Sequence, residues 1–324
     1  MREELILGIL IAGTGNKAEG PTFGGEKYRA PYQSLVDEAA SRGMKTYRVF
    51  AESYDAERGG FTSFYDLSDP AWPRTTDGFI QPSVLWDRAP FSFELHRRKL
   101  ELVRTIPMVN DPLFSLTAAS KLAPNELFSD YAIPTRVIWR QEQLEEAAEA
   151  LSGDRLVAKP MIGTGGKGVH ILPREQIKEL TDIPPSGLVL QELVDTTVGI
   201  PGIADGPHDL RLVFVGEEVC YASVRIPPEG SLISNVARGA TKHVIQPDLL
   251  PSELNEVIEL IRERFAVFTH KIYSVDFLFG PDGPRVVEMN YTPGFFFEDE
   301  DRATQDRFFA LTMDHLRSAI SSFV

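Results

Sequence analysis

The stretch Leu156–Leu172 reads LVAKPMIGTGGKGVHIL and determines which fold we expect. An apolar run ends in Lys159-Pro160, a glycine-rich loop follows, and apolar residues resume at Val169. Glycine lets the backbone approach an anion closely, and apolar runs on both sides of a short loop are typical of two strands. We therefore expect a β-hairpin whose loop binds phosphate, with an ordinary glycine-rich turn as the alternative.

This context differs from two familiar glycine motifs. A Walker A loop ends in Gly-Lys-Ser/Thr and opens a helix, and a dinucleotide-binding loop is also followed by a helix. Here Gly168 leads into the apolar run Val169–Leu172, which favours a strand. Neither of the two motifs is therefore expected.

The composition restricts the classes of function. The chain has 324 residues, 43% of them hydrophobic, so we expect two or three lobes with proper cores. A net charge of -14 and the lack of a basic run argue against nucleic acid as a partner. Cys220 has no second cysteine for a disulfide or zinc site, and no run reaches the roughly eighteen apolar residues of a membrane span. We expect a cytoplasmic protein that binds neither nucleic acid nor membrane.

The pattern of apolar residues predicts a mixed α/β protein. We expect an N-terminal α/β domain over residues 1–115, a central lobe over 116–194 and a C-terminal lobe over 195–324. Helices are predicted over 31–42, 91–103, 120–128, 141–152 and 304–323. Strands are predicted over 5–11, 45–50, 78–86, 107–110, 135–139, 187–194, 209–215, 219–226, 274–279 and 285–290.

Two carboxylates and an amide lie in the last predicted hairpin. Asp276 lies in SVDFLF, a Pro-Asp-Gly turn follows, and Glu288 and Asn290 lie in RVVEMN. Positions two apart on a strand share a face, so the hairpin would bring these side chains together. Carboxylate and amide oxygens are the ligands that Mg²⁺ prefers. The alternative is that each carboxylate pairs with a basic side chain such as Arg285.

Taken in order, the motifs resemble those of ATP-grasp enzymes, and most closely the glutathione-synthetase and ribosomal-protein-glutamylating (RimK-like) branch. The resemblance covers roughly residues 107–295 and is carried by the combination Lys121, Lys159-Pro160 with its glycine loop, Gln191–Val194, Asp209-Leu210-Arg211, Arg225, Asn235 with Arg238-Gly239, Asp276 and Glu288-Met289-Asn290. Trp86–Pro90, followed by a helix and by Asn110–Pro112, is similar to glutathione synthetases more loosely.

The resemblance implies a fold and a reaction. It implies an N-terminal α/β domain on the substrate side, a small central lid lobe and a C-terminal lobe with an antiparallel sheet, with ATP between the last two. Such enzymes phosphorylate a carboxylate with ATP, and an amine attacks the acylphosphate to form an amide, releasing ADP and phosphate. The cofactors would be ATP and Mg²⁺, with Mn²⁺ as an alternative. The substrates would be a small-molecule or peptide carboxylate and an amine, and self-association is a reasonable expectation.

The resemblance also implies roles in binding ATP. Lys121 and Lys159 would contact the α- and β-phosphates, and Asp209 would hold the ribose. Adenine would be read by Gln191 and Glu192 with the backbone of Leu193 and Val194. A flexible lid would close over the phosphates through Gly163, Thr164, Gly165, Gly166, Lys167 and Gly168, although Lys167 could equally be solvated. Magnesium would be held by Asp276, Glu288 and Asn290.

Arginines are the expected catalytic groups. Arg225 would stabilise the transferring phosphoryl group, because a guanidinium suits developing negative charge, and Arg211 would clamp a substrate carboxylate. Asn235 and Arg238-Gly239 resemble the family segment that frames the reacting groups, and Ala240 stands where the family has a second glycine. Two other functions stay open: an ATP-grasp phosphotransferase that makes no amide, and an ATP-binding regulator without turnover.

Overall fold

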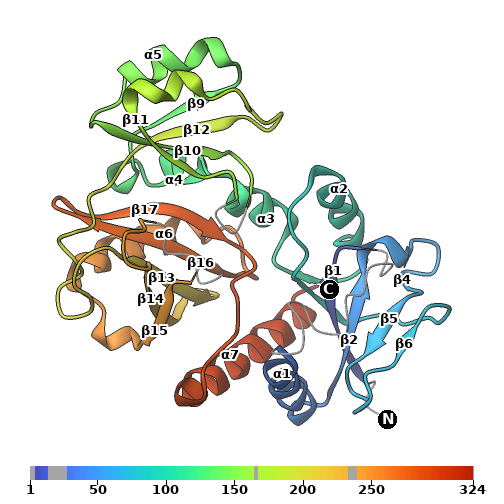
Figure 1. Cartoon of the computed structure of the whole chain (residues 1–324). Helices are drawn as coiled ribbons and strands as arrows, with labels where there is room; N and C mark the ends of the chain where they lie inside the picture. The colour runs from blue at the N-terminus through green and yellow to red at the C-terminus, as the bar shows by residue number, and fades with distance from the viewer. Residues whose placement is uncertain (1–3, 14–27, 164–166, 233–238, 324) are drawn as a thin grey trace.

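The computed structural model describes residues 4–13, 28–163, 167–232 and 239–323. Its main sheets have six, four and five strands, and a further pair, β3 and β4, forms a sheet of its own. Figure 1 shows the four-stranded sheet above the five-stranded one, with the six-stranded sheet to the side. The predicted mixed α/β class is confirmed.

The six-stranded sheet contains the N-terminal strands in the order β6-β5-β2-β1-β7-β8. β1 pairs in parallel with both β2 and β7, and its side chains are mostly buried because the helices cover it. The elements are β1 (Leu5–Ile11), α1 (Arg29–Ser41), β2 (Met44–Phe50), β3 (Tyr54–Asp55), β4 (Gly60–Phe61), β5 (Phe64–Asp66), β6 (Arg74–Thr75), β7 (Val84–Asp87), α2 (Phe93–Leu102) and β8 (Met108–Val109). The strands that follow β1 are thus added first on one side of it, beginning with β2, and later on the other side, beginning with β7. The carboxyl ends of the parallel strands β1 and β7 lie side by side.

The central lobe is a small antiparallel sheet in the order β11-β10-β12-β9. β10 and β11 form the predicted hairpin around the glycine loop, with Leu156 paired to Leu172. The elements are α3 (Pro112–Ala119), α4 (Ala123–Leu127), β9 (Thr135–Ile138), α5 (Leu144–Glu149), β10 (Arg155–Pro160), β11 (His170–Pro173) and β12 (Leu188–Glu192). Apolar side chains of α5 pack on one face of this sheet.

The C-terminal sheet is antiparallel, in the order β15-β14-β13-β16-β17. One face of the sheet packs on α6. On the other face, residues near the β13–β14 turn and the start of β16 pack on α7 and the N-terminal lobe. The elements are β13 (Asp209–Val215), β14 (Glu218–Ile226), β15 (Thr241–Ile245), α6 (Asn255–Phe265), β16 (Ile272–Gly280), β17 (Gly283–Asn290) and α7 (Arg302–Ser321).

Helix α7 packs against both the N-terminal and the C-terminal sheet. In Figure 1 it runs beside α1, and its buried side chains, such as Phe308 and Met313, share one core with Trp86 of β7 and Tyr221 of β14. Within the described residues, none of the helices combines the length and apolarity needed to cross a membrane.

The helix predicted over 120–128 is present as the shorter α4, which begins at Ala123, so Lys121 precedes the helix instead of lying on it. Lys121 lies in the link between α3 and α4, where its backbone N–H donates to the Met161 carbonyl at 3.1 Å. This bond ties the link to the glycine hairpin, and Pro124 lies in the first turn of α4, where the missing N–H costs nothing. Helix α3 was missed, although Asp111 caps it and Pro112 opens it, which is a recognisable start signal.

The other predicted elements are present, the strands over 5–11 and 209–215 with the predicted ends and most of the others with different ends. The strand predicted over 78–86 is limited to β7, because Pro82 has no N–H to donate to a neighbouring strand. The helix predicted over 141–152 is α5, which is shorter. The division at residues 115 and 194 into three lobes stays a prediction.

Candidate active site

The last hairpin brings two predicted metal ligands face to face. β16 and β17 pair so that Asp276 lies opposite Glu288 and Ser274 lies opposite Asn290. The register shifts between Asp276 and Phe277, an irregularity of the kind that often re-aims side chains near functional sites. The Ser274 hydroxyl is buried and has no hydrogen-bond partner among the residues that the structure describes, so a polar group beside this face would satisfy it.

Asp276 is held by two arginines. Arg211 Nε and Nη2 donate to its carboxylate at 2.7 and 2.6 Å, and Arg225 Nη2 donates to it at 2.7 Å. Arg225 also donates through Nε to Asp209 at 2.8 Å. The alternative of a basic partner therefore holds for Asp276, but Arg285 is elsewhere and donates to the Asp130 carbonyl.

This network sets the protonation of its members. Burial would raise the pKa of Asp276, but Arg211 and Arg225 outweigh it and lower the pKa to about 2. Burial raises the pKa of Asp209 to about 7, although Arg225 opposes the shift. The pKa of Arg225 is raised by both carboxylates against the effect of burial. Arg225 and Asp276 are thus a charged pair at neutral pH, and the roles predicted for Arg211 and Asp209 stay predictions.

Two lysines of the central lobe lie within electrostatic reach of Glu288. Lys121 and Lys159 are 6% and 5% exposed. Burial lowers the pKa of Lys121, and it lowers that of Lys159 to about 8, while Glu288 opposes both shifts. The Lys121 ammonium donates to the Gly163 carbonyl at 2.6 Å. Two cations therefore gather where the hairpin loop meets the C-terminal sheet.

The carboxylates fit a magnesium ion in their chemistry. Glu288 has no hydrogen bond or ion pair with the other described residues, so its oxygens are available as hard donors. Asp276 keeps lone pairs beyond those that the arginines use, because a carboxylate offers about four acceptor sites. Asn290 is the weakest of the three, since its Oδ1 accepts from the Thr292 N–H and hydroxyl. The donor set agrees with the prediction and does not test it.

In the segment predicted to bind adenine, the side chains of Gln191 and Glu192 form hydrogen bonds within the protein. Gln191 donates to the Thr135 hydroxyl at 2.7 Å, and Glu192 accepts from the Ser152 N–H. Leu193 and Val194 follow β12 and are half-buried, so their backbone is the part that stays suited to a nucleobase edge. Val194 lies against Gly280 at the end of β16, which brings this link to the C-terminal sheet.

The glycine loop is described only in part. Gly163 and Lys167 are exposed, and Thr164, Gly165 and Gly166 lie outside the described residues. Gly168 has a φ of +70°, and a Cβ there would lie 2.9 Å from the Pro160 ring. Glycine is thus required at position 168 by the hairpin itself.

The predicted framing segment is also described in part. Asn235 and Arg238 lie outside the described residues, and Gly239 has a φ of +94°. Among the non-glycine residues that the structure describes, the positive φ belongs to Trp72, so Ala240 adopts an ordinary conformation. Alanine is therefore tolerated where the family has its second glycine.

A buried polar network at the junction of the lobes was not predicted. Lys99 pairs with Asp87 at 2.8 Å, with both side chains at most 1% exposed. Tyr291, which follows Asn290, donates to the Ala89 carbonyl at 2.7 Å. Asn110 donates to the carbonyls of Tyr291 and Ile272. The signal was Asp87 at the end of an apolar run, but its partner Lys99 stands in a charged stretch and could not be paired with it without a structure.

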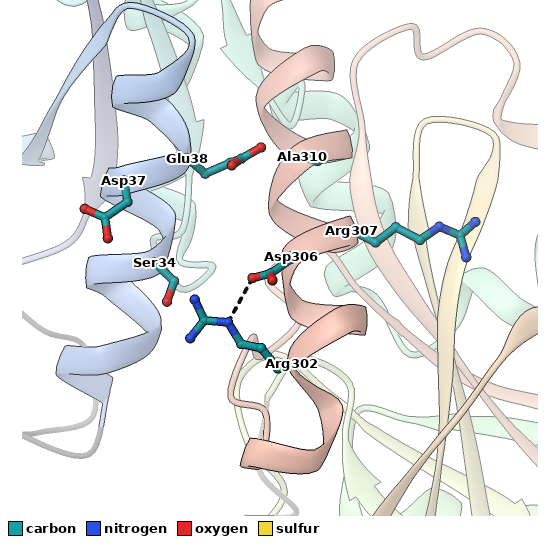
Figure 2. A pocket seen from close by; sticks show the side chains of 7 residues that line it. All are labelled: Ser34, Asp37, Glu38, Arg302, Asp306, Arg307 and Ala310. Atoms are coloured by element: carbon teal, nitrogen blue, oxygen red, sulfur yellow. Dashed lines mark hydrogen bonds and ion pairs between the residues drawn. The ribbon is translucent and has the colours of Figure 1, made fainter.

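A groove of about 520 Å³ lies away from these residues, between α1 and α7 (Figure 2). Its charged side chains are largely paired, as Arg302 is with Asp306 at 3.0 Å and Arg307 is with Glu218. None of the predicted site residues lines it; the lining is Ser34, Asp37, Glu38, Arg302, Asp306, Arg307 and Ala310.

Comparisons with known proteins agree with the resemblance. A family model described as "RimK-like ATP-grasp domain" matches residues 121–304. The ribosomal protein bS6--L-glutamate ligase of Shigella boydii is 27% identical over 204 residues, which are 61% of this chain and 63% of that protein. The chain thus matches less than two thirds of the length of this curated relative.

Solved structures show the same fold. A RimK domain ATP-grasp protein from Sphaerobacter thermophilus superposes with a TM-score of 0.59 at 16% identity, over 96% of this chain and 99% of that one. D-alanyl-alanine synthetase A from Vibrio cholerae gives a TM-score of 0.63 at 13% identity, over 99% and 100% of the two chains. At these identities the likeness concerns the fold alone.

Proposed function

The chain belongs to the RimK-like ATP-grasp family, and on that premise we propose that it is an ATP-dependent ligase that joins a carboxylate to an amine. The carboxylate is phosphorylated by ATP, the amine attacks the acylphosphate, and an amide, ADP and phosphate result. A carboxylate oxygen is a poor leaving group, and phosphorylation converts it into a phosphate that departs when the amine attacks, which is why ATP is consumed.

One observation supports this proposal most strongly. Buried Lys121 and Lys159 lie within electrostatic reach of Glu288, and Lys159 also of Asp276. A triphosphate needs cations on one side and a carboxylate-held metal on the other, and phosphoryl transfer depends mainly on such positioning. Lys121 and Lys159 are the cations in this proposal, and Glu288 and Asp276 are the carboxylates that would hold the metal.

The side chains then have distinct proposed roles. Lys121 and Lys159 bind phosphate oxygens, and Glu288 and Asp276 with Asn290 hold Mg²⁺, which neutralises phosphate charge when bound. Arg225 stays charged at any working pH and stabilises the transferring phosphoryl group. The Gly163–Gly168 loop covers the phosphates, the Leu193–Val194 backbone contacts adenine, and Asp209 contacts the ribose.

Further roles are proposed for residues that frame the substrates. Asn235 and Arg238-Gly239 orient the reacting groups. Arg211 gives up its ion pair with Asp276 and contacts the carboxylate of the substrate. We propose an amino acid as the amine substrate, because the Shigella relative is named an L-glutamate ligase. L-glutamate is therefore the first amine to test.

The experiment follows ADP release and product mass with purified protein, Mg-ATP, L-glutamate or pooled amino acids, and pooled carboxylate-bearing peptides. We expect ADP release that depends on both substrates and a product one water lighter than their sum. Glu288→Gln should reduce this turnover by about 100-fold or more, because the Mg²⁺ that balances the charge of the reacting phosphates would lose a carboxylate ligand. Asp282→Asn, in the exposed turn beyond the site, is the matched control.

Phosphate transfer to a hydroxyl group without an amide product would contradict the ligase proposal. ATP binding without turnover in every pool would also contradict it.

A further inference from the structure

Arg88 occupies the position where ligands commonly bind in open α/β sheets. It directly follows β7, and its backbone N–H donates to the Leu10 carbonyl of β1 at 2.9 Å. β1 pairs with β2 on one side and β7 on the other, so the chain reverses its direction of winding here. Crevices beside the carboxyl ends of such strands are the usual ligand sites of open sheets.

The Arg88 guanidinium lies beside two aromatic rings. Its central carbon is 5.0 Å from the Trp86 ring and 5.1 Å from the Phe295 ring, and these two rings stack on each other at 5.9 Å. Cation–π contacts orient a guanidinium without using its N–H groups. The Nη1 group of Arg88, which has no hydrogen-bond partner among the described residues, therefore remains available for a ligand.

Arg88 has no anionic partner among the described residues. Its Nη1 is buried without a hydrogen bond, and no ion pair joins its side chain to a carboxylate of the described ranges. The neighbouring Asp87 is already neutralised by Lys99. A buried charge without a counter-charge is costly, and burial lowers the pKa of Arg88 accordingly. Among the described residues, Arg88 is thus a cation without an anionic partner.

The surroundings connect Arg88 to the proposed active site. Tyr221 and Tyr291 both lie within its electrostatic reach. Tyr291 directly follows Asn290, and Tyr221 shares a face of β14 with Arg225, since the two lie four residues apart on one strand. The hydrogen bond from the Tyr291 hydroxyl to the Ala89 carbonyl fixes the backbone beside Arg88 to the end of β17, which carries Glu288 and Asn290.

We propose that Arg88 binds a carboxylate of the substrate that is not the one activated by ATP. This inference rests on the proposed function and adds to it a specificity-determining residue from outside the ATP-grasp domain. A guanidinium binds a carboxylate through two parallel hydrogen bonds, and its flat fork distinguishes a carboxylate from the corresponding amide. The substrate class is then an amino acid or peptide with a free carboxylate that survives the reaction. That carboxylate belongs either to the amine substrate or to the activated one.

Ligand-induced stabilisation tests this without turnover. The melting temperature of the wild type is measured with the proteinogenic amino acids, with glutarate and succinate, and with the matching amides, in the presence of Mg-ADP. We expect carboxylate probes, but not their amides, to raise the melting temperature of the wild type and of Arg98→Gln. Arg98 is a partly exposed arginine of the same lobe, paired with Glu94, and serves as the matched control.

Arg88→Gln should lose this response, and Arg88→Lys, which keeps the charge but not the fork, should retain only part of it. In the ligase assay the KM of the substrate that carries the carboxylate should rise about 10- to 100-fold in Arg88→Gln, with the KM for ATP unchanged. The substrate whose KM rises shows whether the carboxylate is on the amine or on the activated partner.

Equal stabilisation of the wild type and both Arg88 variants would overturn the proposal, as would a wild type that no carboxylate probe stabilises. Should Arg88→Gln fail to fold, Arg88→Lys decides the outcome. Failure of the ligase function is seen separately, as a lack of condensed product with wild-type protein in every pool.

Discussion

Two carboxylates that face each other across β16 and β17 have different environments. Asp276 is 2% exposed and accepts hydrogen bonds from two arginines, whereas Glu288 forms no ion pair with the described residues. Asp276 therefore contributes to stability as well as to the proposed metal site. Glu288 is the carboxylate whose loss should affect the reaction with little effect on the fold.

Asp276→Asn should lower the free energy of unfolding by about 3 to 5 kcal/mol. The substitution keeps the size of the side chain but leaves Arg211 and Arg225 as neighbouring buried cations with fewer counter-charges. Urea unfolding measures the change. Asp282→Asn is the control, because its side chain is 86% exposed and should change stability very little. A loss below about 1 kcal/mol in Asp276→Asn would show that the arginines do not depend on this carboxylate.

The affinity for ATP should fall as the pH rises through about 8. Burial lowers the pKa of Lys159 to about 8 in the protein without nucleotide, so the ammonium loses its proton above that pH. Phosphate binding requires the charged form, and affinity is therefore greatest below this pKa. Equilibrium titration with ATP across this range gives the profile.

Two variants assign that profile. Lys159→Arg should keep its charge and flatten the profile, because arginine does not deprotonate. Burial also lowers the pKa of Lys242 to about 8, so Lys242→Arg is the matched control and should leave the profile unchanged. An unchanged profile in Lys159→Arg would assign the titration to another group.

At the scale of elements, the β10–β11 hairpin connects the two proposed halves of the ATP site. Its loop reaches Lys121 through the Met161 carbonyl, and Lys159 lies near its end. The hairpin could be predicted from Lys159, the glycines and the β-branched residues after them. The position of Lys121 could not, because the bond that holds it joins segments whose contact only the fold determines.

Gly168→Ala should lower the free energy of unfolding by about 1 to 2 kcal/mol. Position 168 has a φ of +70°, which an L side chain adopts at a cost, and its Cβ would approach the Pro160 ring to 2.9 Å. Gly163→Ala is the control in the same loop, since its nearest neighbour would be the Lys121 ammonium at 3.9 Å. Thermal and urea unfolding should therefore separate the two variants. Equal stability of both would contradict the conformation described for Gly168.

Helix α7 is attached to β16 through a histidine that stays neutral. His315 Nε2 accepts a hydrogen bond from the Lys271 N–H at 3.0 Å. Burial, together with His270 and Lys271, lowers the pKa of His315 from 6.5 to about 4. Between these values the unfolded chain binds a proton that the folded protein does not.

The free energy of unfolding should therefore fall by about 3 kcal/mol as the pH drops from 6.5 to about 4. His315→Gln should remove most of this part of the pH dependence, whereas His170→Gln, which changes an exposed side chain, should not. Urea unfolding across this pH range measures both. A pH dependence that is identical in His315→Gln and the wild type would contradict the neutral, buried state of His315.

At the scale of the whole molecule, local patterns predicted elements better than contacts between them. The alternation around Asp276 and Glu288, with its Pro-Asp-Gly turn, was enough to place these carboxylates opposite each other. The pairing of Arg211 with Asp276 depends on the register of β13 against β16, which no local signal encodes. The surroundings of Arg88 could not be predicted either, because β7, the Phe295 segment and β14 are brought together only by the core that they share with α7.

The most direct test of the central claim is the fate of a carboxylate oxygen. The carboxylate substrate is labelled with heavy oxygen in both positions, and the phosphate released with wild-type protein, Mg-ATP and amine is analysed by mass spectrometry. Activation as an acylphosphate predicts one labelled oxygen in the phosphate for each amide formed. Amide formation with unlabelled phosphate would contradict the account, because the carboxylate would then not have been phosphorylated.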